Sequence, residues 1–397
     1  MDTELVESEG RNAPIEKRLS GYGQSPPGSL RVLMAAGGTG GHIFPALAVA
    51  REIQVSAVQG RGESRAGRSP EIAFLGTNRG LESRVIPQDG FKLHVVAAAG
   101  LKNTGGAQRV RNLLVLPRSA IQSASVLRSF RPHVVVGMGG YLAGPVMLEA
   151  AVMGIPSLLI ELNAVPGFTN RLLAPFISLA AVGFEASSSY FGKKARWTGH
   201  PVRSPIGQVL PREHRAPLTL FIVGGSQGSV AINSSVIAAL PLLAKSKPIL
   251  RIIHQSGSRD FERVRAAYAK ESIDAEVHAF VDNMAAALSR ADLVVSRAGA
   301  MTVAELAAAG RASILVPLPS ASDNHQLANA KMLARLGGAK ILEQGDLNPA
   351  SFCQVIEELF ANPVQLVEME RNARKIFVPD AAKRIAELVL ELAGFRF

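Results

Sequence analysis

Two glycine-rich turns carry the residue types that could bind a phosphate. The first, "GGTGG" at 37–41, separates the apolar run 31–36 from a helix-like stretch, and "GGSQGS" at 224–229 repeats this order. A glycine turn between a strand and a helix exposes backbone N–H groups at the positive end of the helix dipole. Two such turns in facing domains would border one anion-binding cleft.

Other glycine motifs predict different chemistry. Neither turn has the lysine of a Walker A motif, and Ile43 takes the place of the last glycine of a dinucleotide-binding fingerprint. Residues 224–228 do match the G-x-S-x-G nucleophile elbow, with Ser226 as the nucleophile, and Asp292 and His325 follow in hydrolase order. The hydrolase alternative stays open here, although it leaves the first turn without a role.

Metal-ligand patterns do not occur in the sequence. The eight histidines form no i, i+4 pair, and neither HExxH nor Asp-x-Asp is present. If a reaction at these turns releases a diphosphate, its negative charge would have to be stabilised by backbone N–H groups, helix dipoles, hydroxyls and arginines. We therefore expect neither a metal nor another cofactor.

Composition limits the class of protein and its partners. A chain of 397 residues predicts two domains, and its net charge of +11 predicts an anionic partner. One tryptophan, four tyrosines and no RNA-binding motif disfavour nucleic acid and leave phosphate ligands or an anionic membrane surface. The single cysteine fits a reducing cytoplasm, and Glu149 and Glu161 interrupt the best candidate membrane span.

Short continuous apolar runs alternate with helix-like stretches, which is typical of parallel sheets covered on both faces. Strands are predicted at 31–36, 71–76, 93–98, 133–139 and 156–161. The pattern restarts at 218–240, with further predicted strands at 249–257, 276–281, 291–299 and 312–319. The fold class is therefore α/β, with two Rossmann-like, doubly wound domains.

The same pattern predicts the domain boundaries. We expect a flexible extension over 1–30, a first domain over 31–200 and a second over 201–380, joined by the proline-rich "GHPVRSP". The last helix, within 381–397, is expected to pack back on the first domain.

Five motifs in order now point to a family: "GGTGGHIFPALAVA", "GMGGYLAGP", "GGSQGS", "AGAMTVAELAAAG" and "DNHQLANA". Together they resemble the MurG family, which transfers N-acetylglucosamine (GlcNAc) from UDP-GlcNAc to undecaprenyl-linked lipid I and gives lipid II for peptidoglycan synthesis. The resemblance runs from about residue 31 to the C-terminus. It implies the GT-B arrangement of two facing domains, independence of metal and inversion at the anomeric carbon.

The resemblance also implies a donor site. Ser226 would hold the α-phosphate, the Val281 backbone would pair with uracil, and Glu305 would accept the ribose hydroxyls. The other donor-binding positions that it implies are Thr39, Gly40, Gly41, Asn163, Arg203, Ala300, Met301, Thr302, Val303, Ala304 and Gln326.

On the acceptor side, His42 is the candidate general base, and a helix cap or packing group is the alternative. Gly139, Gly140 and Tyr141 resemble an acceptor-facing loop, in which Tyr141 could instead be a core aromatic.

Two positions depart from the family pattern. Leu162 replaces a glutamine and His200 replaces an asparagine. Any polar role of the first position is lost, and the sequence assigns no role to the histidine.

The lipid acceptor implies a peripheral protein at the cytoplasmic face of the bacterial inner membrane. Within 102–131, basic residues surround the apolar "LLVL" at 113–116 and suit an anionic bilayer. They are Lys102, Arg109, Arg111, Arg118, Arg128 and Arg131. The alternative is an amphipathic helix whose apolar side is core. Proteins of cell-wall synthesis or division are further implied partners.

Three other functions stay open at this point. They are another GT-B transferase with a lipid or natural-product acceptor, a UDP-sugar 2-epimerase, and a nucleotide-sugar binding module without activity.

Overall fold

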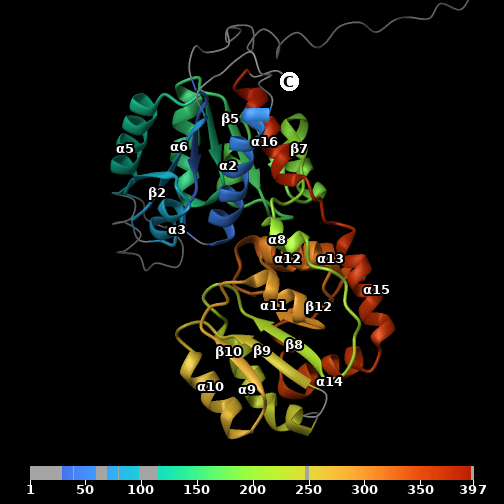
Figure 1. Ribbon diagram of the computed structural model, residues 1–397. Coiled ribbons are helices and arrows are strands. Elements are labelled where there is room, and N and C mark those ends of the chain that lie inside the picture. Colours follow the sequence, from blue (N-terminus) through green and yellow to red (C-terminus); the bar gives the residue numbers. More distant parts are fainter. Residues whose placement is uncertain are drawn as a thin grey trace, which may run out of the picture.

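The computed structural model describes residues 29–38, 40–59, 69–78, 80–97, 115–245 and 250–394, without the side chains of 59, 115–117, 141 and 322. The chain forms two α/β halves, drawn one above the other in Figure 1. Each half is built on a parallel sheet with helices packed against it, which confirms the predicted fold class.

The first sheet has seven parallel strands in the order β3-β2-β1-β4-β5-β6-β7. Its strands are β1 (Arg31–Ala35), β2 (Glu71–Gly76), β3 (Lys92–Val95), β4 (Val134–Gly137), β5 (Ser157–Glu161), β6 (Leu179–Val182) and β7 (Ala195–Trp197). β4 and β5 are buried along their whole length, as expected for strands covered on both faces. The sequence analysis did not predict β6 and β7, which have four and three residues.

The helices of this half follow the strands in the chain. They are α2 (Gly40–Gln59), α3 (Glu82–Gln88), α5 (Val115–Phe130), α6 (Gly140–Val152) and α7 (Phe168–Leu173), followed by 3₁₀ turns at η2 (Glu185–Tyr190) and η3 (Gly192–Lys194). Gly139, which precedes α6, has a φ of 80°, a value that glycine adopts far more readily than other residues.

The second sheet has six parallel strands in the order β10-β9-β8-β11-β12-β13. They are β8 (Leu218–Val223), β9 (Leu250–Gln255), β10 (Ala275–His278), β11 (Leu293–Ser296), β12 (Ser313–Leu315) and β13 (Ala339–Ile341). β8 occupies the place that β1 occupies in the first sheet, with the sequence-later β11 beside it as β4 is beside β1. The repeated sequence pattern therefore corresponds to a repeated topology.

The helices of the second half are α9 (Val230–Leu243), α10 (Phe261–Lys270), α11 (Met284–Arg290), α12 (Ala300–Ala309), α13 (His325–Ala334), α14 (Pro349–Phe360) and α15 (Pro363–Arg374), with the 3₁₀ turn η5 (Ser322–Asn324) before α13. Asn348 and Ser351 form a reciprocal capping box at the start of α14.

The last helix, α16 (Ala381–Leu392), returns to the first half and packs against α2 (Figure 1). Ile385, Val389 and Leu390 are fully buried and lie in one apolar cluster with residues of α2. The segment between α15 and α16 is thus a second covalent connection between the halves, in addition to the linker 198–217 that contains the short helix α8 (Ser204–Gly207).

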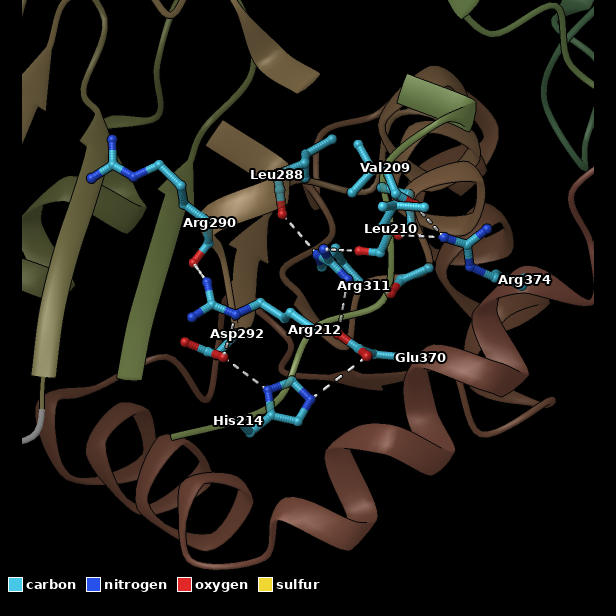
Figure 2. A network of polar contacts seen from close by, with 12 residues as sticks. Val209, Leu210, Arg212, His214, Leu288, Arg290, Asp292, Arg311, Glu370 and Arg374 are labelled. Carbon is cyan, nitrogen blue, oxygen red and sulfur yellow. Dashed lines mark hydrogen bonds and ion pairs between the residues drawn. The ribbon is translucent and has the colours of Figure 1, made fainter. Parts of the chain in front are cut away.

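A buried polar network anchors this linker to the second half (Figure 2). His214 Nδ1 lies 2.8 Å from Asp292 Oδ1, and its Nε2 lies 3.6 Å from Glu370 Oε2. Arg212 also pairs with Asp292, at 3.1 Å. The hydrogen bond to Asp292, together with the interaction with Glu370, raises the pKa of His214 to about 9, so the imidazole is a cation between two carboxylates.

Arg311 extends the network, although its side chain has no exposed surface. Its guanidinium pairs with Glu370 at 3.2 Å and donates to the carbonyls of Leu288 and Leu210 at 2.7 and 2.9 Å. Such a buried cation is tolerated because its donors have partners. The network therefore fixes the linker through both its backbone and its side chains.

The His214 cation predicts a specific pH dependence of stability. The pKa is raised from 6.5 to about 9 on folding, so the stabilisation is complete below about pH 6.5 and is lost as pH rises through about 9. In His214→Gln, whose amide does not titrate, the thermal unfolding midpoint should fall less between about pH 7 and pH 10. Differential scanning calorimetry measures this, and equal falls in both proteins would contradict the charged pairing.

Candidate functional site

In the described part of the chain, a cleft lies between the two halves. The glycine turns that follow β1 and β8 both border it, contributing Gly40 and Gly41 from one side and Gly225 and Ser226 from the other. The cleft contains about 880 Å³ of space, part of it open to solvent. A cleft at the carboxyl ends of parallel strands is the usual ligand site of such folds.

The second turn can be built only with glycine at two of its positions. A side chain on Gly228 would run into the backbone of Ser256, and one on Gly224 would run into Ser229. Gly225 has a φ of 95°. The Ser226 hydroxyl and the backbone N–H groups of the turn thus lie at the start of α9, where an anion is favoured.

Gln255 connects this turn to the predicted uracil position. Its Nε2 donates to the Gly225 carbonyl, and its Oε1 accepts from the Val281 N–H, each at 2.8 Å. Gln255 lines the cleft and is almost fully buried. It is absent from the predicted site, although its place near the end of the predicted strand 249–257 was a usable signal.

Arg203 and Glu305 form an ion pair that lines the cleft, and Arg203 also contacts Phe44 of the first half. The Arg203 guanidinium lies 3.0 Å from Glu305 Oε1 and 4.8 Å from the centre of the Phe44 ring. Burial raises the pKa of Glu305, and the positive charge of Arg203 opposes that rise. The sequence predicted both residues at the donor but did not predict that they pair with each other.

Asn163 lies where the two halves meet. Its Nδ2 donates to Glu161 Oε1 at 3.0 Å, and its Oδ1 accepts from Asn329 Nδ2 at 3.2 Å. Both the nitrogen and the oxygen of the predicted donor-binding amide are therefore hydrogen-bonded to protein groups.

His42 and the predicted acceptor loop lie side by side. A Cβ added to Gly140 would be 3.6 Å from the imidazole Cε1 of His42. Burial lowers the pKa of His42, a hydrogen bond with Gly37 opposes this, and the nearby His325 lowers it further. The imidazole is thus neutral near pH 7 and has the protonation state that a general base needs.

The remaining predicted residues differ in how they face the cleft. Met301 and Thr302 line it, and Ala300 begins α12. The side chains of Val303 and Ala304 are buried, so these two positions can reach a donor only through their backbone.

Other predicted positions are less fully placed. Gln326 Oε1 accepts from the Leu318 N–H at 2.9 Å, which orients its amide. Thr39 lies outside the described residues, as does the side chain of Tyr141.

The two departures from the family pattern contact each other. His200 Nε2 donates to the Leu162 carbonyl at 2.8 Å, and both side chains are buried. The His200 ring packs edge-on against Phe184, and burial lowers its pKa to about 4. His200 is therefore a neutral packing residue of the linker, and Leu162 contributes to the core.

The structure rules out the hydrolase triad. Asp292 precedes β11 and bonds to the N–H of Thr219 at 2.7 Å, at the amino ends of the strands. Ser226 follows β8 at the opposite, carboxyl edge of the same parallel sheet. Asp292 thus anchors the linker through His214 and cannot orient a catalytic histidine beside Ser226.

The described residues contain no group of three or more His, Cys, Asp or Glu side chains that could hold a metal ion. None of their helices is both long enough and apolar enough to cross a bilayer.

Comparison with known sequences gives the family. Residues 32–182 match the glycosyltransferase family 28 N-terminal domain, and residues 219–385 match the C-terminal domain of that family. The chain belongs to glycosyltransferase family 28. A relative from Myxococcus xanthus is 40% identical over 366 residues, 91% of this chain and 93% of its own. It is named a UDP-N-acetylglucosamine--N-acetylmuramyl-(pentapeptide) pyrophosphoryl-undecaprenol N-acetylglucosamine transferase.

Solved structures place the fold in the same group. MurG of Acinetobacter baumannii is 32% identical, with a TM-score of 0.72 over 91% of this chain and 99% of its own. A putative UDP-N-acetylglucosamine 2-epimerase of Listeria monocytogenes is 12% identical, with a TM-score of 0.64 over 91% and 96% of the two chains, and shares the fold alone. The predicted GT-B architecture and glycosyltransferase class are thereby confirmed.

The Arg203–Glu305 pair predicts how UDP binding depends on pH. The family resemblance implies that an ionised Glu305 accepts the ribose hydroxyls, and on that expectation UDP binding should weaken as pH falls through the pKa of Glu305, which burial raises. Arg203→Met removes the charge that opposes the raised pKa. The variant should bind UDP about tenfold more weakly near pH 7 and lose binding at a higher pH than wild type.

Isothermal titration calorimetry with UDP at several pH values tests this. The matched control is Arg265→Met, which removes the arginine of an exposed pair with Glu262 on α10 and should bind UDP like wild type. If the pH midpoint of UDP binding is the same in Arg203→Met and in wild type, the ionisation of Glu305 does not control UDP binding.

Proposed function

We propose that the protein transfers N-acetylglucosamine from UDP-GlcNAc to the C4 hydroxyl of the N-acetylmuramoyl residue of lipid I, giving lipid II and UDP for peptidoglycan synthesis. The observation that carries the proposal is a cleft lined by both glycine turns and the Arg203–Glu305 pair, with His42 directly after the first turn. The relatives named for this reaction match nearly the whole chain.

The proposed reaction is a direct displacement with inversion. The acceptor hydroxyl attacks the anomeric carbon from the face opposite UDP, and His42 takes its proton. The C1–O bond to the diphosphate breaks as the new glycosidic bond forms. Ser226, the amino end of α12 and Arg203 stabilise the negative charge that develops on UDP.

No cofactor takes part in the proposed chemistry. The charge of the leaving diphosphate is balanced by backbone N–H groups, two helix dipoles and Arg203, which line the same cleft. Metal independence is part of the proposal and is included in its test.

Exposed apolar side chains of the first half support docking to the inner membrane from the cytoplasmic side. The neighbouring helices α5, α6 and α7 and the turn after α7 expose large apolar side chains. They are Ile121, Leu148, Val152, Phe168, Leu172 and Phe176. Soluble proteins seldom expose so many together unless they bind a partner surface.

Basic groups accompany these apolar side chains. Lys194 Nζ bonds to the carbonyl of Pro175, next to Phe176, and Arg118 and Arg128 are exposed on α5. Apolar side chains with nearby cations fit an anionic bilayer surface. Of the predicted patch 102–131, residues 102–114 lie outside the described residues, among them Lys102, Arg109 and Arg111. Cell-wall synthesis or division proteins at the same membrane remain proposed partners.

The proposed reaction is tested by incubating the protein with UDP-GlcNAc and a short-chain lipid I analogue in EDTA. UDP release that depends on the acceptor, together with a disaccharide product, is expected, and His42→Ala should lower kcat by at least about 100-fold. The matched control His278→Ala changes an exposed histidine of β10 and should keep wild-type kcat. Intact donor with a protein that still binds UDP would overturn the assignment. Activity restored by Mg²⁺ would overturn metal independence.

Membrane docking predicts a loss of vesicle binding in Phe168→Ser/Leu172→Ser. Wild type should cosediment with phosphatidylglycerol vesicles at low salt and less at high salt, and the double variant should bind at least about tenfold more weakly. The control Val367→Ser changes an exposed apolar residue of α15 in the second half and should bind like wild type. Equal binding by all three proteins would exclude the α7 face.

A further inference from the structure

A buried asparagine of α13, Asn329, joins the two halves with its side chain. Its Oδ1 accepts from the Ala164 N–H at 2.9 Å, and its Nδ2 donates to Asn163 Oδ1 and to the Ala298 carbonyl, each at 3.2 Å. Asn163 and Ala164 belong to the first half, and Ala298 belongs to the second. The side chain has no exposed surface, and both its oxygen and its nitrogen are hydrogen-bonded.

On the first half, the hydrogen bonds continue from Asn163 to Glu161. This carboxylate accepts from the backbone N–H and the Nδ2 of Asn163 at 2.8 and 3.0 Å, from Gly167 N at 3.1 Å, and from Asn170 Nδ2 at 2.7 Å. Burial raises the pKa of Glu161, and these four donors oppose the rise. The segment after β5 is therefore folded around one buried carboxyl group.

The same chain of contacts reaches the acceptor loop. The Asn170 amide packs against Gly139, where a Cβ would lie 2.7 Å from its Nδ2. The next residue, Gly140, lies beside His42. At the other end, Ala298 immediately precedes Gly299, which is the N-cap residue of α12 at the phosphate side of the cleft.

We infer that Asn329 is a positioning residue that sets the spacing of the two halves, and with it the alignment of the acceptor loop against the donor's phosphate end. This inference rests on the proposed function, in which the two reacting groups are held by different halves. A misplacement of about 1 Å can cost about 100-fold in rate. A buried amide suits this role because a shift of either half would break its hydrogen bonds at a place where no water can replace them.

A second contact between the halves provides a matched control. Arg171 and Asp323 form an ion pair at 3.0 Å, and both side chains are more than a third exposed. Such surface pairs contribute little to stability. Asp323→Asn removes this pair and should change kcat by less than about twofold.

The main test is Asn329→Asp, which keeps the shape and the acceptor for the Ala164 N–H but places an oxygen against Asn163 Oδ1 and the Ala298 carbonyl. We expect kcat to fall by about 10- to 100-fold. The Kd for UDP, whose candidate contacts lie mostly in the second half, should stay within about threefold of wild type. Asn329→Ala serves as a second variant in case the new carboxylate disturbs folding, which loss of UDP binding would reveal.

Small-angle X-ray scattering with UDP-GlcNAc gives a readout that does not depend on activity. Wild type and Asp323→Asn should share one radius of gyration, and both Asn329 variants should have a larger one. Unchanged kcat and scattering would overturn the inference, as would equal falls of kcat and UDP affinity in both variants. If wild type transfers no sugar to the lipid I analogue while the Asn329 variants still expand, the proposed function fails and the spacing role stands.

Discussion

The carboxyl ends of two parallel sheets face one another, and the polar groups of the cleft depend on this arrangement. The connection after β1 leads into α2 and the connection after β8 leads into α9, so both helix amino ends approach one space. Unpaired N–H groups at these ends favour an anion. A diphosphate can therefore be held by backbone and hydroxyl groups, provided that the two halves keep their relative position.

The chain fixes that relative position in several ways. The linker is anchored to the second half by buried charges around His214 and Arg311, and α16 returns to pack on α2. Between these connections, the halves contact each other through polar groups: Arg203 with Phe44 and Glu305, and Asn329 with the segment after β5. Polar contacts of this kind are directional, so a shift of one half against the other breaks their hydrogen bonds.

Burial sets the protonation of the site in opposite directions for acids and bases. It lowers the pKa of His42 and raises the pKa of Glu305 and Glu161, and in each carboxyl group neighbouring donors or cations oppose the shift. His42 thus remains neutral, while Arg203 favours the ionised form of Glu305. In the proposed reaction, such a site separates the base for the acceptor from the anion-binding region for the donor.

The sequence by itself determined the α/β class, the duplicated topology and the glycine turns, because strand periodicity and glycine geometry are local properties. The order of motifs also gave the family and the positions of Ser226 and Glu305. Only the tertiary structure decided that Arg203 pairs with Glu305, that Gln255 bridges two loops, and that Asn329 joins the halves. It also separated Asp292 from Ser226, although their order fitted a hydrolase. Such contacts join residues far apart in the chain, and no local pattern encodes their distances.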